Sequence, residues 1–112
     1  MKKESMFQSD LIKDLKNLFP GCFVLKTDSS RTQGFPDLLI LFKNKWAALE
    51  CKRASKASRQ PNQEYYVNLL GEMSYASFIY PENKQEVLDE LQQTFRSKRK
   101  TRVSKSEQLS LG

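Results

Sequence analysis

Three charged side chains stand at the ends of two apolar segments of this chain. Asp37 closes the segment GFPD just before the apolar run LLILF, and Glu50 and Lys52 follow a second apolar run, WAAL, after the polar turn KNK. Side chains alternate between the two faces of a strand, so Glu50 and Lys52 are expected on one face and Cys51 on the other. If the two runs form a β-hairpin, Asp37 approaches Glu50 across the ladder. The pattern thus predicts two carboxylates and an ammonium group in one small space.

Such a cluster suits the hydrolysis of a phosphodiester. Two neighbouring carboxylates repel each other unless a cation lies between them, and their hard oxygen atoms favour Mg²⁺ or Mn²⁺ over Zn²⁺. The metal would polarise a phosphoryl oxygen and lower the pKa of a bound water, while Lys52 could orient that water and offset the charge of the transition state.

Each of these residues also has a simpler interpretation. An Asp that follows Pro, as Asp37 does, is often a turn or capping residue, and Glu50 and Lys52 could form an exposed pair on an edge strand. The combination favours the functional interpretation, because three charges at the ends of apolar strands are costly unless a ligand offsets them.

A wider set of residues resembles a known family. The segment GFPDLLILFKNKWAALECKR is similar to the PD-(D/E)XK nuclease superfamily, and more narrowly to its VRR-NUC branch of small stand-alone or appended domains. That resemblance extends to Glu4 and Gln8 in ESMFQ and to Gln63 in PNQEYYVNLL, and it covers residues 1 to 95. The implied domain is a nuclease domain over residues 1–95, followed by a tail over residues 96–112.

The resemblance implies a role for each matched acid. Asp37 and Glu50 would ligate Mg²⁺ or Mn²⁺ together with the backbone carbonyl of Cys51, a position at which the family often carries a small aliphatic residue. Glu4 would join from the first helix, through water or a second metal. An acid near a helix N-terminus is also common for its effect on the helix dipole, although Glu4 lies on the apolar stripe of its helix and is expected to continue the buried face.

Two further side chains receive roles from the same resemblance. Lys52 would be the catalytic base or electrostatic stabiliser, and Gln63 would orient water or phosphate. A solvated position in the first turn of a helix is an equal alternative for Gln63. These residues complete the predicted catalytic set of Asp37, Glu50, Lys52, Glu4 and Gln63.

The remaining pattern predicts the order α-β-β-β-α-β-α. We expect a first helix that ends before Pro20, a strand at 22–26, the hairpin, a helix capped by Ser58 with Pro61 in its first turn, a strand at 75–80 and a helix at 84–95. Apolar residues at helical spacing predict the core faces of the three helices: Phe7, Leu11, Leu15 and Leu18; Tyr66, Leu69, Leu70 and Met73; and Val87, Leu88, Leu91 and Phe95. The fold class is therefore α/β, with a small restriction-endonuclease-like core in which a central mixed sheet of about four strands is flanked by helices.

The positive charge is concentrated in the tail. The chain holds 19 basic and 13 acidic residues, and residues 96 to 112 contain six Lys or Arg against one acid. This polar segment is expected to be disordered and to contact DNA phosphates through Lys98, Arg99 and Lys100, unless it is only a solvated terminus. A second basic cluster beside the site contains Lys52, Arg53, Lys56 and Arg59. Its DNA contacts would come from Arg53 and above all from Lys56 and Arg59, with a solvated loop as an equal alternative.

Several other chemistries are excluded. The chain has no His, which removes histidine bases and Ser-His triads, and its two Cys form no zinc motif. With no secretory signal or apolar span in the sequence, we expect reduced core thiols in an intracellular, cytoplasmic protein with no membrane partner.

Two functions remain open from the sequence. The first is an endonuclease that acts as a homodimer on branched or structured DNA, such as a Holliday junction resolvase, since two symmetric sites can address two strands. The second is a non-catalytic DNA-binding protein that retains the nuclease fold.

Overall fold

The computed structural model describes residues 3–28 and 30–96. Three helices and four strands follow one another in the predicted order. They are α1 (Glu4–Leu18), β1 (Phe23–Lys26), β2 (Leu38–Phe42), β3 (Lys45–Cys51), α2 (Pro61–Met73), β4 (Tyr75–Ile79) and α3 (Lys84–Arg96).

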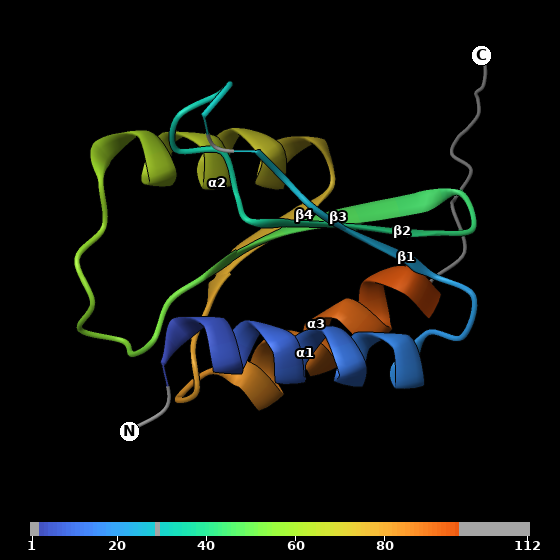
Figure 1. Cartoon of the computed structure of the whole chain (residues 1–112). Coiled ribbons are helices and arrows are strands. Elements are labelled where there is room, and N and C mark those ends of the chain that lie inside the picture. The colour runs from blue at the N-terminus through green and yellow to red at the C-terminus, as the bar shows by residue number, and fades with distance from the viewer. Residues whose placement is uncertain (1–2, 29, 97–112) are drawn as a thin grey trace, which may run out of the picture.

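The four strands form one mixed sheet in the order β1-β2-β3-β4. The pairs β1·β2 and β2·β3 are antiparallel, whereas β3 and β4 are parallel and connected by α2. Helix α2 covers one face of the sheet, and α1 and α3 lie on the opposite face (Figure 1). The predicted α/β class, with a mixed four-stranded sheet between helices, is confirmed.

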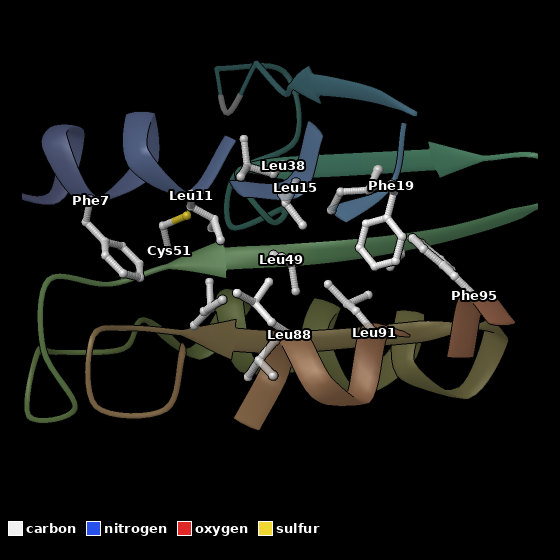
Figure 2. Packing of buried hydrophobic residues seen from close by; sticks show 14 residues of the cluster. Phe7, Leu11, Leu15, Phe19, Leu38, Leu49, Cys51, Leu88, Leu91 and Phe95 are labelled. Atoms are coloured by element: carbon white, nitrogen blue, oxygen red, sulfur yellow. The ribbon is translucent and has the colours of Figure 1, made fainter. Parts of the chain in front are cut away.

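The larger core lies between the sheet and the pair α1 and α3. Phe7, Leu11 and Leu15 from α1 approach Leu88 and Leu91 from α3 across β3 (Figure 2). From the sheet, alternate residues enter this cluster, because only one face of each strand points toward it. These residues are Leu38, Ile40, Ala47, Leu49, Cys51 and Ile79.

Helix α1 ends differently from the predicted core pattern. Leu18 was expected in the core, but 37% of it is exposed, while the next residue, Phe19, is 5% exposed. The chain leaves helical geometry after Leu18, and this turns Phe19 inward, where its ring packs 5.4 Å from that of Phe42 and 5.0 Å from that of Phe95. Phe19 therefore takes the place expected for Leu18.

Helix α2 also corrects two predictions. It begins at Pro61, so Ser58 lies outside it and does not cap it. Met73 was expected in the apolar face, but it is 63% exposed, and Val67 and Leu70 are the buried residues. Helix α2 packs mainly on β3 and β4 and buries only a narrow stripe, so Met73 lies on the exposed part of its last turn.

The other elements match the prediction closely. All four apolar residues predicted for α3 are buried. Strand β1 begins one residue later than expected and β4 ends one residue earlier, which is within the usual fraying of element ends. None of the helices in the described ranges is both long and apolar enough to cross a bilayer. The predicted tail lies outside the described residues after Arg96.

Candidate active site

Strand β3 presents different residues to its two sides. Ala47, Leu49 and Cys51 are fully buried in the core against α1 and α3. Glu50 and Lys52 project toward α2 instead, and they are only 3% and 9% exposed. The alternation predicted from the sequence is thus present, but the pair is buried under a helix and does not lie on a solvated edge.

Asp37 joins this pair from the start of β2. Leu38 pairs with Leu49 in the antiparallel ladder, so the residue before Leu38 lies at the level of Glu50. The Asp37 carboxylate accepts a hydrogen bond from the backbone N–H of Cys51, with a distance of 2.9 Å from Oδ2 to the nitrogen. This bond holds Asp37 beside the segment that carries Glu50 and Lys52.

Gln63 connects the acid and the base. Its Nε2 donates to Glu50 Oε2 at 2.9 Å, and its Oε1 accepts from Lys52 Nζ at 2.8 Å. The direct distance between Lys52 Nζ and Glu50 Oε2 is 3.9 Å. Gln63 is itself fixed, because Oε1 also accepts the backbone N–H of Gln60 at 3.0 Å, in the first turn of α2. The solvated alternative for Gln63 is therefore wrong.

The carboxylates are unfavourable as charged groups in this environment. Burial, and then the negative charge of Asp37, raise the pKa of Glu50 to about 7. Burial also raises the pKa of Asp37, although the Cys51 N–H and the charge of Lys52 act in the opposite direction. Raised pKa values of neighbouring buried carboxylates are common at sites that bind a cation.

One oxygen of Glu50 lacks a partner. Oε1 is buried and, within the part of the chain that the structure describes, it accepts no hydrogen bond. An unsatisfied buried carboxylate oxygen is costly, and a bound cation would satisfy it. The oxygen atoms of Asp37 and Glu50 thus fit a hard divalent metal.

Glu4 lies near the cluster but is not buried. Partial burial and the charge of Asp37 raise the pKa of Glu4, while the charges of Lys52 and Arg53 lower it, so Glu4 lies within electrostatic range of the acidic and the basic groups. Its side chain is nevertheless exposed, contrary to the expectation that it continues the buried stripe, because α1 begins at this residue and extends past the edge of the core. Across residues 3–28 and 30–96, no three His, Cys, Asp or Glu side chains form a complete metal site by themselves.

The thiol of Cys51 has no chemical role in this arrangement. Burial raises its pKa to about 12, with the charge of Asp37 as the next contribution, and the Gln8 side chain hydrogen bonds to it. The thiol is fully buried and remains protonated, so it acts as a small core residue. The two cysteines, Cys22 and Cys51, are not joined by a disulfide.

A close contact between a loop and α2 sets the position of Asp37. Gly34 has φ of +90°, and a Cβ at this position would lie 2.4 Å from Asn62 Cβ and 2.9 Å from its carbonyl carbon. Nearby, Thr27 Oγ1 donates to Pro36 O at 2.6 Å. The segment that leads into Asp37 is therefore pressed against the same helical turn that carries Gln63.

The basic residues near the site differ in their surroundings. Arg53, Lys56 and Arg59 are all exposed. The guanidinium of Arg59 lies 3.9 Å from the centre of the Phe78 ring, a stacking contact that no sequence pattern predicts. Lys98, Arg99 and Lys100 lie outside the described residues.

Sequence reasoning also missed an anchor of the loop between β3 and α2. The backbone N–H of Ser55 donates to Glu82 Oε1 at 3.2 Å, and Ser55 Oγ donates to Glu82 Oε2 at 3.4 Å. These bonds tie the loop that follows Lys52 to the turn after β4. No local pattern marks either residue, since the contact joins segments that are far apart in the sequence.

A comparison with solved structures identifies the fold. A structure described as "VRR_NUC domain protein" aligns with 84% of this chain and 90% of its own length, with a TM-score of 0.62 and 17% sequence identity. The chain has a VRR_NUC fold. The resemblance predicted from GFPD, ECK and their spacing is thus confirmed as a shared architecture. No family model and no curated protein matches the sequence, so the VRR_NUC likeness is structural.

Proposed function

We propose that this protein is a nuclease that hydrolyses phosphodiester bonds of DNA with the help of Mg²⁺ or Mn²⁺. The observation that carries this proposal is the linked arrangement of Glu50, Gln63 and Lys52, with Asp37 beside it. An acid and a base are buried together and held by one amide, while one acid oxygen remains unsatisfied. The VRR_NUC fold supports the same class of function.

Asp37 and Glu50 would hold the metal, together with the backbone carbonyl of Cys51, and Glu4 would contribute from the rim. The bound metal would polarise the phosphoryl oxygen and acidify a water molecule. A binding module has no use for this acidic pair, because without a cation it repels phosphate.

Lys52 supplies the remaining charge. Lys52 is 9% exposed and its ammonium group is held by Gln63, so it needs little reorganisation to meet a phosphate. In this position Lys52 offsets the negative charge that develops on the phosphoryl oxygens and orients the attacking water. Gln63 is a positioning residue that keeps Lys52 and Glu50 at their separation. Arg53 and Lys56 would contact flanking phosphates, and the tail residues Lys98, Arg99 and Lys100 would add a salt-dependent attraction.

The proposed substrate is branched or structured DNA, including Holliday junctions, with two copies of the chain acting together in the cell interior. Support for self-association comes from the edge strand β1, on which Phe23 is 66% exposed and Leu25 is 47% exposed. An edge strand with bulky apolar residues is a natural place for pairing with a second copy. Sedimentation of the wild type and of a Phe23→Ser variant tests this element, and a wild-type monomer at micromolar concentration would refute it.

The proposed chemistry is tested with labelled linear duplex, flap and four-way junction DNA, in Mg²⁺, Mn²⁺ or EDTA. Asp37→Asn keeps an acceptor for the Cys51 N–H and removes only the charge, and Lys52→Met keeps most of the packing. Each should lower cleavage by at least about a hundredfold. Glu72→Gln, which removes an exposed charge from the same helix as Gln63, is the matched control and should cleave like the wild type.

The result also separates the alternatives. Cleavage that persists in EDTA, or that is equal in Asp37→Asn and wild type, would refute the proposed site. DNA binding with no cleavage of any substrate in either metal would establish the non-catalytic alternative instead.

A further inference from the structure

A polar hollow lies beside the candidate site, between α2 and β4. Its volume is about 450 Å³, and Arg59, Glu64, Asn68, Ser77, Phe78 and Tyr80 are among its lining residues. Phe78 is the register partner of Glu50, so both side chains project toward α2 from neighbouring strands. Neighbouring strands lie about 4.8 Å apart. The part of the hollow that Phe78 lines therefore lies one strand away from Glu50.

Arg59 stacks on an aromatic ring at this hollow. Its guanidinium lies 3.9 Å from the centre of the Phe78 ring. Phe78 is 8% exposed, whereas Arg59 is exposed, so the arginine lies over the ring and remains accessible to solvent. A guanidinium plane supported from below by an aromatic ring is a platform on which a nucleic-acid base can stack.

The other lining groups favour a base over a phosphate. Glu64 contributes a negative charge to the wall, which repels a phosphate but can accept hydrogen bonds from the amino or imino groups of a base. The side chains of Asn68 and Glu64 make no hydrogen bond or ion pair with other residues in the described ranges, so both are available to a ligand. Asn83, in contrast, is occupied, because its Oδ1 accepts from the Tyr80 N–H and its Nδ2 donates to Phe78 O.

We propose that this hollow binds an unpaired nucleobase that neighbours the cleaved phosphate, stacked on Arg59. The inference deepens the proposed function and rests on it for the identity of the strand. A base inside a duplex is not available for such stacking unless it is flipped out, at a cost that single-stranded or unpaired nucleotides do not have. The hollow therefore selects DNA with an unpaired nucleotide next to the site, as found in flaps, overhangs and imperfect junctions.

Binding measurements in EDTA test this without requiring cleavage. Fluorescence anisotropy would compare a blunt duplex, the same duplex with a short thymidine overhang, and the same duplex with an abasic overhang. The two overhangs carry equal numbers of phosphates, so any difference between them is due to the bases. We expect the thymidine overhang to bind about tenfold more tightly than the abasic one.

Arg59→Lys is the informative variant, since it keeps the positive charge and removes the flat stacking surface. It should abolish the difference between the two overhangs, and any loss of affinity for the blunt duplex should be smaller than the loss for the thymidine overhang. Lys56→Ala, in the same loop, should weaken binding of all three DNAs equally.

Two outcomes would overturn the inference: equal binding of the thymidine and abasic overhangs by the wild type, or an equal effect of Arg59→Lys on all three DNAs. The second outcome would make Arg59 a phosphate contact only. Preference for bases without any metal-dependent cleavage would refute the proposed function and leave the hollow as a binding site. Cleavage that depends on Asp37, with no base preference, would support the proposed function and refute the inference about the hollow.

Discussion

Removal of the charge of Glu50 should stabilise the metal-free protein above neutral pH. Glu50 is 3% exposed, and burial and the charge of Asp37 raise the pKa of its carboxyl group from the ordinary value of 4.5 to about 7. Glu50→Gln keeps the shape of the side chain and an oxygen that can accept the hydrogen bond from Gln63 Nε2. The variant therefore isolates the charge.

The direction in which stability changes with pH follows from the number of protons bound in the folded and unfolded states. Between about pH 4.5 and about pH 7 the unfolded chain has released this proton while the folded protein retains it, so stability falls as the pH rises through this window. Each pH unit is equivalent to about 1.4 kcal/mol, which gives a loss of about 3 kcal/mol that is complete above about pH 7. Asp37 and Glu4 act in the same direction, because their pKa values are also raised.

Denaturant unfolding in EDTA, at several pH values from about 5 to about 8, measures this effect. Wild type and Glu50→Gln should have similar stability at the acidic end, and the variant should be more stable by about 3 kcal/mol at the alkaline end. Addition of Mg²⁺ should raise the stability of the wild type at about pH 8 and have little effect on the variant, because a ligand that binds only the folded state stabilises it.

Glu72→Gln, an exposed acid on α2, serves as the control and should follow the wild type at every pH. The reasoning would be refuted by equal stability of wild type and Glu50→Gln at about pH 8. It would also fail if the wild type gained stability between about pH 5 and about pH 7 relative to the variant.

Three further predictions address the framework around the site. Gly34→Ala should destabilise the protein by about 2 kcal/mol more than Gly21→Ala, because both glycines have φ of +90° but only Gly34 would place a Cβ against Asn62; thermal unfolding of the two variants measures the difference. Gln63→Ala should lower metal-dependent cleavage about 10- to 100-fold with little change in DNA affinity, and a loss of affinity alone would contradict its positioning role. Deletion of residues 97–112 removes five Lys or Arg, so it should weaken DNA binding and reduce the dependence of affinity on salt, and an unchanged salt slope would rule out the arm.

The sequence was most informative where periodicity alone decides the structure. The alternation around Glu50 and Lys52 placed both residues on one face of β3, and the apolar spacing in α3 predicted its four buried residues. Short-range patterns of this kind depend on neighbours in the chain, so they can be read before the fold is known.

The errors arose where distant segments decide the outcome. Leu18 and Met73 fit the apolar stripes of their helices, but both are exposed, and the non-helical Phe19 takes the core position expected for Leu18. Glu4 also fits the apolar stripe of α1, but it is exposed because the helix begins at this residue. The stacking of Arg59 on Phe78 joins residues from a loop and a strand, and no spacing rule connects them.

The short connection between β2 and β3 limits the insertions and deletions that the fold can tolerate. Only Lys43 and Asn44 separate the two strands, and Lys43 adopts φ of 58°, a left-handed conformation that few side chains favour. A single inserted or deleted codon between Asp37 and Glu50 would shift one strand against the other by one position and exchange the two sides of β3. Leu49 would then face α2 in place of Glu50, and the Glu50 carboxylate would point into the hydrophobic core. Length changes should therefore be far more damaging in this short stretch than conservative substitutions.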